Sequence, residues 1–206
     1  MQQPMPSLLI ATTNQNKLRE YAAIFAGLPL ELRTLRDLGI TDDVDETGAT
    51  FAENARLKAA FYAARSGLPA LADDSGLEVH ALGGEPGVRS ARYAGPGASD
   101  ADRNALLLQK LAHVPFHARL ARFVCAIALG LPDGTLEDVE GSLPGVIDMA
   151  PRGTHGFGYD PLFYVLDENA TLAELPPERK NAISHRAQAA RAARVVLERW
   201  VAQGLL

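Results

Sequence analysis

The sequence contains a single cysteine, so an internal disulfide is excluded. That residue, Cys125, lies in the apolar run Phe123–Ile127, which has the pattern of a buried strand. A buried thiol with no activating neighbour in sequence behaves as a small hydrophobic side chain rather than as a nucleophile. One cysteine also suits a reducing compartment, and we expect a cytoplasmic protein.

Long hydrophobic runs are missing as well. The longest apolar run, Phe123–Leu131, is far shorter than the roughly 20 residues that span a bilayer. The segment before Ser7 has neither the basic start nor the cleavage signal of a secretory leader, so we expect no signal peptide and no membrane partner.

Positive charge is not in excess. The formal net charge is −5 and the pI is about 5.5, which argues against broad nucleic-acid binding because that usually needs a basic face. A small basic pocket for one phosphorylated ligand stays possible. The histidines show no zinc-ligand spacing, and no G-x-S-x-G nucleophile motif is present.

What is present is an alternation of strand and helix patterns, as expected for one domain over residues 1–206. The predicted strands cover residues 7–13, 30–35, 68–72, 121–131 and 136–147. One predicted helix places Leu18, Tyr21, Ala22 and Phe25 on one face. Three others begin at capping signals, which are Thr50 with Glu53, Ser99 to Asp102, and Ser184. We expect an α/β fold whose sheet is not purely parallel, because a turn at Pro132-Asp133-Gly134 joins the last two strands. The Gly/Pro-rich stretch 83–97 is either a lobe boundary or a surface loop.

One candidate phosphate site is Thr12-Thr13-Asn14-Gln15-Asn16-Lys17, which follows a strand and opens a helix. Backbone N–H groups and the positive end of a helix suit an anion, and Lys17 adds a full charge. The spacing is not that of a Walker A loop. On this segment alone, a plain helix cap with an exposed lysine is the commoner explanation.

Two acidic segments are candidate metal sites. Asp73-Asp74-Ser75-Gly76 follows a predicted buried strand, where paired carboxylates need a cation or a donor. Mg²⁺ takes one or two carboxylates and completes its shell with water and phosphate oxygens. An Asp-rich turn is the competing explanation. In the acidic stretch 42–48, which is otherwise solvated surface, we select Glu46 as a second metal carboxylate, with Asp45 as the alternative.

Three further segments carry polar groups at useful positions. Asn54 and Lys58 are four residues apart and share a helix face. The segment 156–161, G-F-G-Y-D-P, offers an aromatic ring between glycines, which suits stacking on a base. Lys180 precedes Ser184-His185-Arg186 at a predicted helix start. Taken singly, each has a structural explanation.

Six segments together resemble the inosine triphosphate pyrophosphatase family, including its bacterial members that act on non-standard purines. They occur in family order from Leu8 to Arg186: L-L-I-A-T-T-N-Q-N-K, D-E-T-G-A-T-F-A-E-N-A-R-L-K-A, L-A-D-D-S-G-L-E-V, P-G-V-R-S-A-R-Y, G-F-G-Y-D-P-L-F and N-A-I-S-H-R. One motif is weak, but six in order are specific. Thr13 and His155 depart from the family pattern, in the phosphate loop and in the loop beside the base.

The resemblance implies an elongated, two-lobed α/β fold with a long mixed central sheet flanked by helices and a cleft between the lobes. It implies a homodimer, a Mg²⁺ cofactor and purine nucleoside triphosphates as substrates. Glu46 and Asp74 would hold Mg²⁺, and Asp74 would also be the catalytic base. The substrate would be bound by Thr12, Thr13, Asn14, Gln15, Asn16, Lys17, Lys58, Ser75, Phe157, Gly158, Tyr159, Asp160, Lys180, His185 and Arg186.

Two other functions remain open at this stage. A catalytically silent nucleotide-binding regulator is disfavoured by the paired carboxylates, since binding alone would tolerate fewer negative groups near phosphate. A pyrophosphatase for modified pyrimidines is disfavoured by the His185-Arg186 pair.

Overall fold

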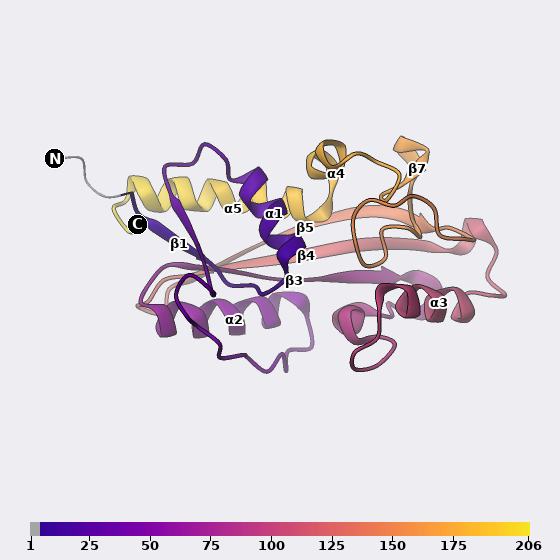
Figure 1. Ribbon diagram of the computed structural model, residues 1–206, viewed down its shortest axis with the longest axis horizontal. Helices are drawn as coiled ribbons and strands as arrows, with labels where there is room; N and C mark the ends of the chain where they lie inside the picture. The colour runs from indigo at the N-terminus through magenta and orange to yellow at the C-terminus, as the bar shows by residue number, and fades with distance from the viewer. Residues whose placement is uncertain (1–4) are drawn as a thin grey trace. The chain divides into compact units, whose positions relative to one another are not determined.

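The computed structural model describes residues 5–206 and contains a seven-stranded sheet with helices packed on it (Figure 1). The strands are β1 (Ser7–Ile10), β2 (Glu31–Thr34), β3 (Ala70–Val79), β4 (Leu120–Gly130), β5 (Leu136–Ile147), β6 (Phe163–Val165) and β7 (Ala170–Thr171). The α-helices are α1 (Gln15–Ile24), α2 (Phe51–Ser66), α3 (Asp100–Lys110), α4 (Pro177–Ile183) and α5 (His185–Ala202). Among the described residues, no helix is long and apolar enough to cross a membrane.

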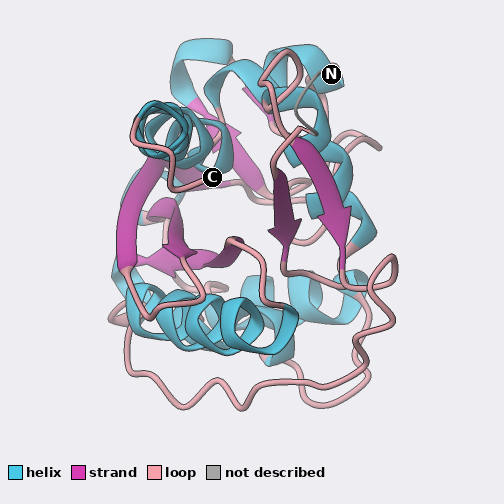
Figure 2. Cartoon of the chain, turned by 90° about the vertical axis from the view of Figure 1, so that its left-hand side faces the viewer, coloured by secondary structure: helices cyan, strands magenta, loops and turns pink. Residues whose placement is uncertain are grey.

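The sheet is mixed, with strand order β2-β1-β3-β4-β5-β6-β7. Strand β1 pairs in parallel with both β2 and β3, whereas β6 pairs antiparallel with both β5 and β7. Strands lie between helices in Figure 2. The predicted α/β class is therefore confirmed, as is the prediction that β4 and β5 are neighbours.

The chain divides into two compact units, each with its own hydrophobic core. Unit 1 comprises the described residues up to Asp74 together with Cys125–Gly141 and Arg186–Leu206, and unit 2 comprises Ser75–Val124 and Ser142–His185. Strands β3, β4 and β5 each contribute residues to both units. The core of unit 1 joins β1, β3 and β4 to α1 and α5, and includes Tyr21 and Trp200. The core of unit 2 joins α3 to β4, β5 and β6.

Capping residues set two helix starts as the sequence predicts. The Thr50 side chain accepts the Glu53 N–H while the Glu53 carboxylate accepts from the Thr50 N–H, and Gly67 ends the helix in the left-handed region. Ser99 and Asp102 form the same reciprocal box at α3. These signals are local, so they need no tertiary contact to act.

Several predictions need correction. Ala22 is exposed, whereas Tyr21 and Phe25, with which it was predicted to share a helix face, are buried. The third strand does not end at Ala72 but continues to Val79. Helix α4 and strands β6 and β7 were not predicted, because each is seven residues or shorter and shows no clear periodicity. The stretch 83–97 lies wholly inside unit 2, so it is not a unit boundary.

Candidate active site

The Asp73-Asp74 pair lies inside β3 rather than in a turn after it. Both carboxylates are buried, at 3% and 7% exposure. Successive residues of a strand point to opposite faces of the sheet, so neighbours in sequence can have different surroundings. In unit 1, cations and hydrogen-bond donors compensate both negative charges. This compensation explains why strand β3 continues through two adjacent acidic residues.

Asp73 is surrounded by positive charge. Its Oδ2 lies 2.9 Å from Lys17 Nζ and 3.8 Å from Arg186 Nε. The Cys125 thiol donates to the same oxygen at 3.8 Å. Burial opposes ionisation of Asp73, but the charges of Lys17, Arg186 and Lys58 outweigh it and hold its pKa below the ordinary value. Asp73 is therefore a fixed anion at neutral pH.

Asp74 has weaker compensation. Asn54 Nδ2 donates to its Oδ2 at 3.0 Å, and Lys58 Nζ lies 3.8 Å from its Oδ1. Burial raises the pKa of Asp74, and the nearby Glu46 charge adds to the rise, against lowering by Lys58 and Asn54. A carboxyl group whose pKa is moved upward is a better proton acceptor than an ordinary aspartate.

Helix α2 supplies the groups that face Asp74. Asn54 and Lys58 share a face of α2, as predicted from their spacing, and Lys58 Nζ donates to Glu46 Oε1 at 2.6 Å. Burial would lower the pKa of Lys58, but Asp73, Asp74 and Glu46 raise it overall. Glu46 thus converges with Asp74 on one ammonium group, whereas Asp45 is exposed.

Asn54 is a site residue that was not predicted to bind substrate or metal. The sequence placed it only on the same helix face as Lys58. Its Oδ1 accepts from Gly48 N at 2.8 Å while its Nδ2 binds Asp74. A Cβ at Gly48 would lie 2.7 Å from that oxygen, so the loop approaches α2 closely because residue 48 is glycine. The signal in the sequence was Gly48 six residues before Asn54, within the family motif.

The Thr12–Lys17 segment caps α1. Asn14 Oδ1 accepts from the backbone N–H groups of Asn16 and Lys17, and Thr12 Oγ1 accepts from Asn14 N. Thr13, Asn14 and Gln15 are exposed. The helix N-terminus, with Lys17 beside it, has the donors and charge that suit a phosphate chain.

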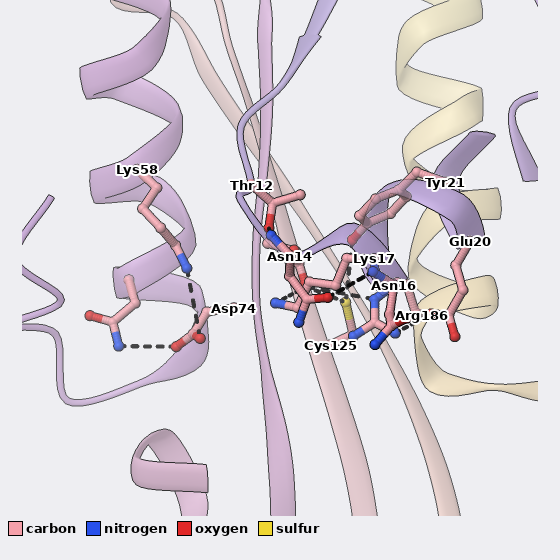
Figure 3. A network of polar contacts seen from close by, with 12 residues as sticks. Thr12, Asn14, Asn16, Lys17, Glu20, Tyr21, Lys58, Asp74, Cys125 and Arg186 are labelled. Atoms are coloured by element: carbon pink, nitrogen blue, oxygen red, sulfur yellow. Dashed lines mark hydrogen bonds and ion pairs between the residues drawn. The ribbon is translucent and has the colours of Figure 1, made fainter. Parts of the chain in front are cut away.

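Arg186 and His185 are adjacent at the start of α5 but belong to different surroundings. The Arg186 guanidinium forms a buried ion pair with Glu20 and lies near Asp73, which raises its pKa (Figure 3). In the same view, Lys58 points at Asp74 from α2, away from the Arg186 group. The His185 ring stacks on Phe123 in unit 2, with centroids 4.6 Å apart. The described contacts of Arg186 therefore lie among the acids of unit 1.

In unit 2 the structure brings Phe157, Asp160 and Lys180 together. Asp160 Oδ2 accepts from Phe157 N at 2.8 Å and from Lys180 Nζ at 2.6 Å, and Lys180 Nζ lies 4.6 Å from the Phe157 ring centroid. Gly156 has φ +77°, and a Cβ there would lie 2.1 Å from Asp160 Oδ2. The loop conformation therefore requires glycine at 156.

The remaining predicted residues of this region are placed differently. Tyr159 is buried in the core of unit 2 and its hydroxyl donates to Ser90 O at 2.9 Å, which gives it a packing role. Gly158 has both its backbone N–H and its C=O bonded to α3. Ser75 follows Asp74 on β3 and is partly buried.

Within residues 5–206, no three acidic, histidine or cysteine side chains cluster as a metal site. The carboxylates that converge are two, Glu46 and Asp74. Two carboxylates suit Mg²⁺, which commonly binds one or two carboxylates plus substrate phosphates.

Residues 8–195 match the model of the Ham1 family. The chain belongs to this family. A dITP/XTP pyrophosphatase of Geobacter sulfurreducens is 56% identical over 185 residues, covering 90% of this chain and 93% of the relative. A dITP/XTP pyrophosphatase of Geobacillus kaustophilus is 52% identical, with coverage of 90% and 91%.

The structure of a HAM1 protein from Coxiella burnetii is similar to this one, with a TM-score of 0.87 and 43% identity. The similarity covers 95% of this chain and all of that one. Membership of the Ham1 family confirms the resemblance drawn from the six motifs, and the likeness extends over nearly the whole chain.

Proposed function

We propose that this Ham1-family chain is a Mg²⁺-dependent pyrophosphatase of non-standard purine nucleoside triphosphates. Its substrates are inosine and xanthosine triphosphates and their deoxy forms, and its products are the monophosphate and pyrophosphate. By removing these nucleotides from the pool, it keeps them out of DNA and RNA. The names of the two bacterial relatives support the substrate class.

The observation that carries the proposal is the arrangement around β3. Two buried, adjacent carboxylates have opposite pKa shifts, with Lys17 and Arg186 beside one and Lys58 beside the other. A triphosphate needs its charge neutralised and its reacting atom positioned, and Lys17, Lys58 and the α1 N-terminus supply both.

Asp74 is suited to accept a proton from the attacking water. The water oxygen forms a bond to the α-phosphorus, the bond from that phosphorus to the bridging oxygen breaks, and pyrophosphate leaves with the bonding electrons. Asp74 takes the water proton, and its raised pKa favours that transfer. No covalent enzyme intermediate is needed, and Cys125 is buried and unsuited to form one.

Glu46 and Asp74 would hold Mg²⁺, because they are the two carboxylates that converge on Lys58. When bound, the ion supplies neutralisation of charge on the phosphate oxygens. Phe157 offers a ring for the base, and Lys180 and Asp160 offer a donor and an acceptor beside it. On the family resemblance the protein acts as a homodimer, and its single cysteine suits the reducing cytoplasm.

A panel of nucleoside triphosphates with product identification tests the proposal. We expect inosine and xanthosine triphosphates to give monophosphate and pyrophosphate, far faster than adenosine triphosphate. Orthophosphate and a diphosphate as first products would refute the bond assignment. Preference for modified pyrimidine nucleotides would refute the substrate class, and absence of all turnover would support a binding regulator. Light scattering tests the dimer.

A further inference from the structure

The loop that carries Phe157 is tied to helix α3 through both polar groups of Gly158. Gly158 N donates to Asp100 Oδ2 at 2.7 Å, and Asn104 Nδ2 donates to Gly158 O at 2.9 Å. Asp100 and Asn104 are four residues apart, so they lie on one face of α3. The two contacts join segments separated by 58 and 54 residues.

Other hydrogen bonds hold the loop further from α3, where the N–H groups of Thr154 and His155 both donate to Ala173 O. Gly156 and Gly158 both have positive φ, at +77° and +64°, and glycine leaves a chain more freedom than any other residue. A cavity of about 440 Å³ lies between the loop and α3. It is lined by Asp100, Asn104 and Leu108 on the helix and by residues 153–158 of the loop. The two hydrogen bonds at Gly158 therefore join the loop to α3 at the edge of this cavity, next to Tyr159, which packs in the core of unit 2.

Phe157 sits between two anchors. On one side, Asp160 holds its backbone N–H and also Lys180, which lies over the ring. On the other side, Asp100 and Asn104 hold the next peptide group. Asn104 is 7% exposed, and burying an amide is costly unless it is hydrogen-bonded. Its Nδ2 is bonded to Gly158 O, whereas its Oδ1 has no hydrogen-bond partner among the described residues.

We propose that Asp100 and Asn104 are positioning residues, which fix the Phe157 loop in the conformation that receives the purine base. This inference rests on the proposed function, because it takes Phe157 as the surface on which the base stacks. Without these two hydrogen bonds, part of the binding free energy is used to order the loop, so the affinity for the nucleotide falls. The chemistry at Asp74 is little affected.

The variants form matched pairs. Asp100→Ala removes the acceptor for Gly158 N, whereas Asp100→Asn keeps one acceptor oxygen of the same reach. It replaces the other oxygen, which accepts from Arg103, by an amide donor and removes the charge. Asn104→Leu removes the donor to Gly158 O with little change in volume. Asp102→Ala, in the same helical turn, removes a charge and breaks the capping box with Ser99, but it removes neither side chain that bonds Gly158.

Two readouts separate positioning from helix stability. We expect Asp100→Ala and Asn104→Leu to raise the KM for inosine triphosphate about tenfold, as the loss of one hydrogen bond allows, with kcat within about threefold of wild type. Asp100→Asn recovers most of the affinity. In hydrogen exchange followed by mass spectrometry or NMR, the amide of Gly158 exchanges faster in Asp100→Ala, but not in Asp102→Ala, at equal global stability.

The proposal is overturned if Asp100→Asn is as impaired as Asp100→Ala, or if Asp102→Ala raises KM as much. It is also overturned if Gly158 exchange is unchanged in Asp100→Ala. If the wild-type protein does not cleave inosine triphosphate, the proposed function is refuted instead. The exchange measurement needs no substrate and would still decide whether α3 anchors the loop.

Discussion

Asp73 and Asp74 are neighbours on one strand, yet their surroundings give them opposite properties. Lys17 and Arg186 keep Asp73 ionised, whereas burial makes ionisation of Asp74 unfavourable. The ionised form of Asp73 therefore stabilises unit 1, whereas the ionised form of Asp74 destabilises it. A group kept in an unfavourable state at a cluster of cations is a better candidate for catalysis than a satisfied one.

The largest expected effect separates the two acids by activity. Asp74→Asn should lower kcat by about 10²–10⁴, because it removes the proposed base and a proposed metal carboxylate together. Its stability should be unchanged or higher at neutral pH, since the raised pKa means that ionised Asp74 opposes folding. Turnover with inosine triphosphate and urea unfolding measure the two quantities. The exposed Asp167→Asn is the control, and near wild-type turnover of Asp74→Asn would move the role to Asp73.

The second prediction separates them by stability. Asp73→Asn should lower the free energy of unfolding by about 3 kcal/mol at pH 7, because Lys17 and Arg186 lose a buried counter-ion. The depressed pKa of Asp73 contributes stability above its unfolded value of about 3.9, and that contribution is lost as the pH falls through the folded value. Urea unfolding of the metal-free proteins should show the difference shrinking below about pH 4. A difference that grows on acidification would contradict this account.

The third prediction concerns the acid that shares Lys58 with Asp74. Glu46→Gln should raise the Mg²⁺ concentration needed for half-maximal activity by about tenfold or more, because it removes a proposed metal carboxylate and even outer-shell groups are worth roughly tenfold. Asp45→Asn is the matched control, because Asp45 is exposed. If Asp45→Asn has the larger effect in a Mg²⁺ titration, the two acids exchange roles.

The smallest effect is expected at Cys125, beside Asp73. Burial raises the pKa of its thiol to about 12, and the Asp73 charge adds to the rise. At pH 8 the native protein should therefore not react with iodoacetamide over an hour, whereas the protein in 8 M urea should react fully. Mass spectrometry counts the label, and rapid labelling of the native protein would show that this side of β3 is open.

Local patterns predicted much of the fold. The capping boxes at Thr50 and Ser99 and the turn at Pro132-Asp133-Gly134 lie where the sequence put them, since each depends on residues a few positions apart. The strand end at Ala72 was predicted wrongly for a related reason. Two adjacent acidic residues predict a turn when the sequence is read locally. The lysines and the arginine that pair with them here are distant in sequence, so a local pattern does not include them.

The sequence by itself determined the α/β class, the main helices and, through six ordered motifs, the family and the set of candidate residues. Only the tertiary structure decided how those residues divide: Asp73 with Lys17 and Arg186, Asp74 with Asn54 and Lys58, and Gly158 with α3. The physical reason is the distance along the chain over which each interaction acts. Propensity and capping act between near neighbours, whereas charge compensation and burial depend on chain segments that folding brings together.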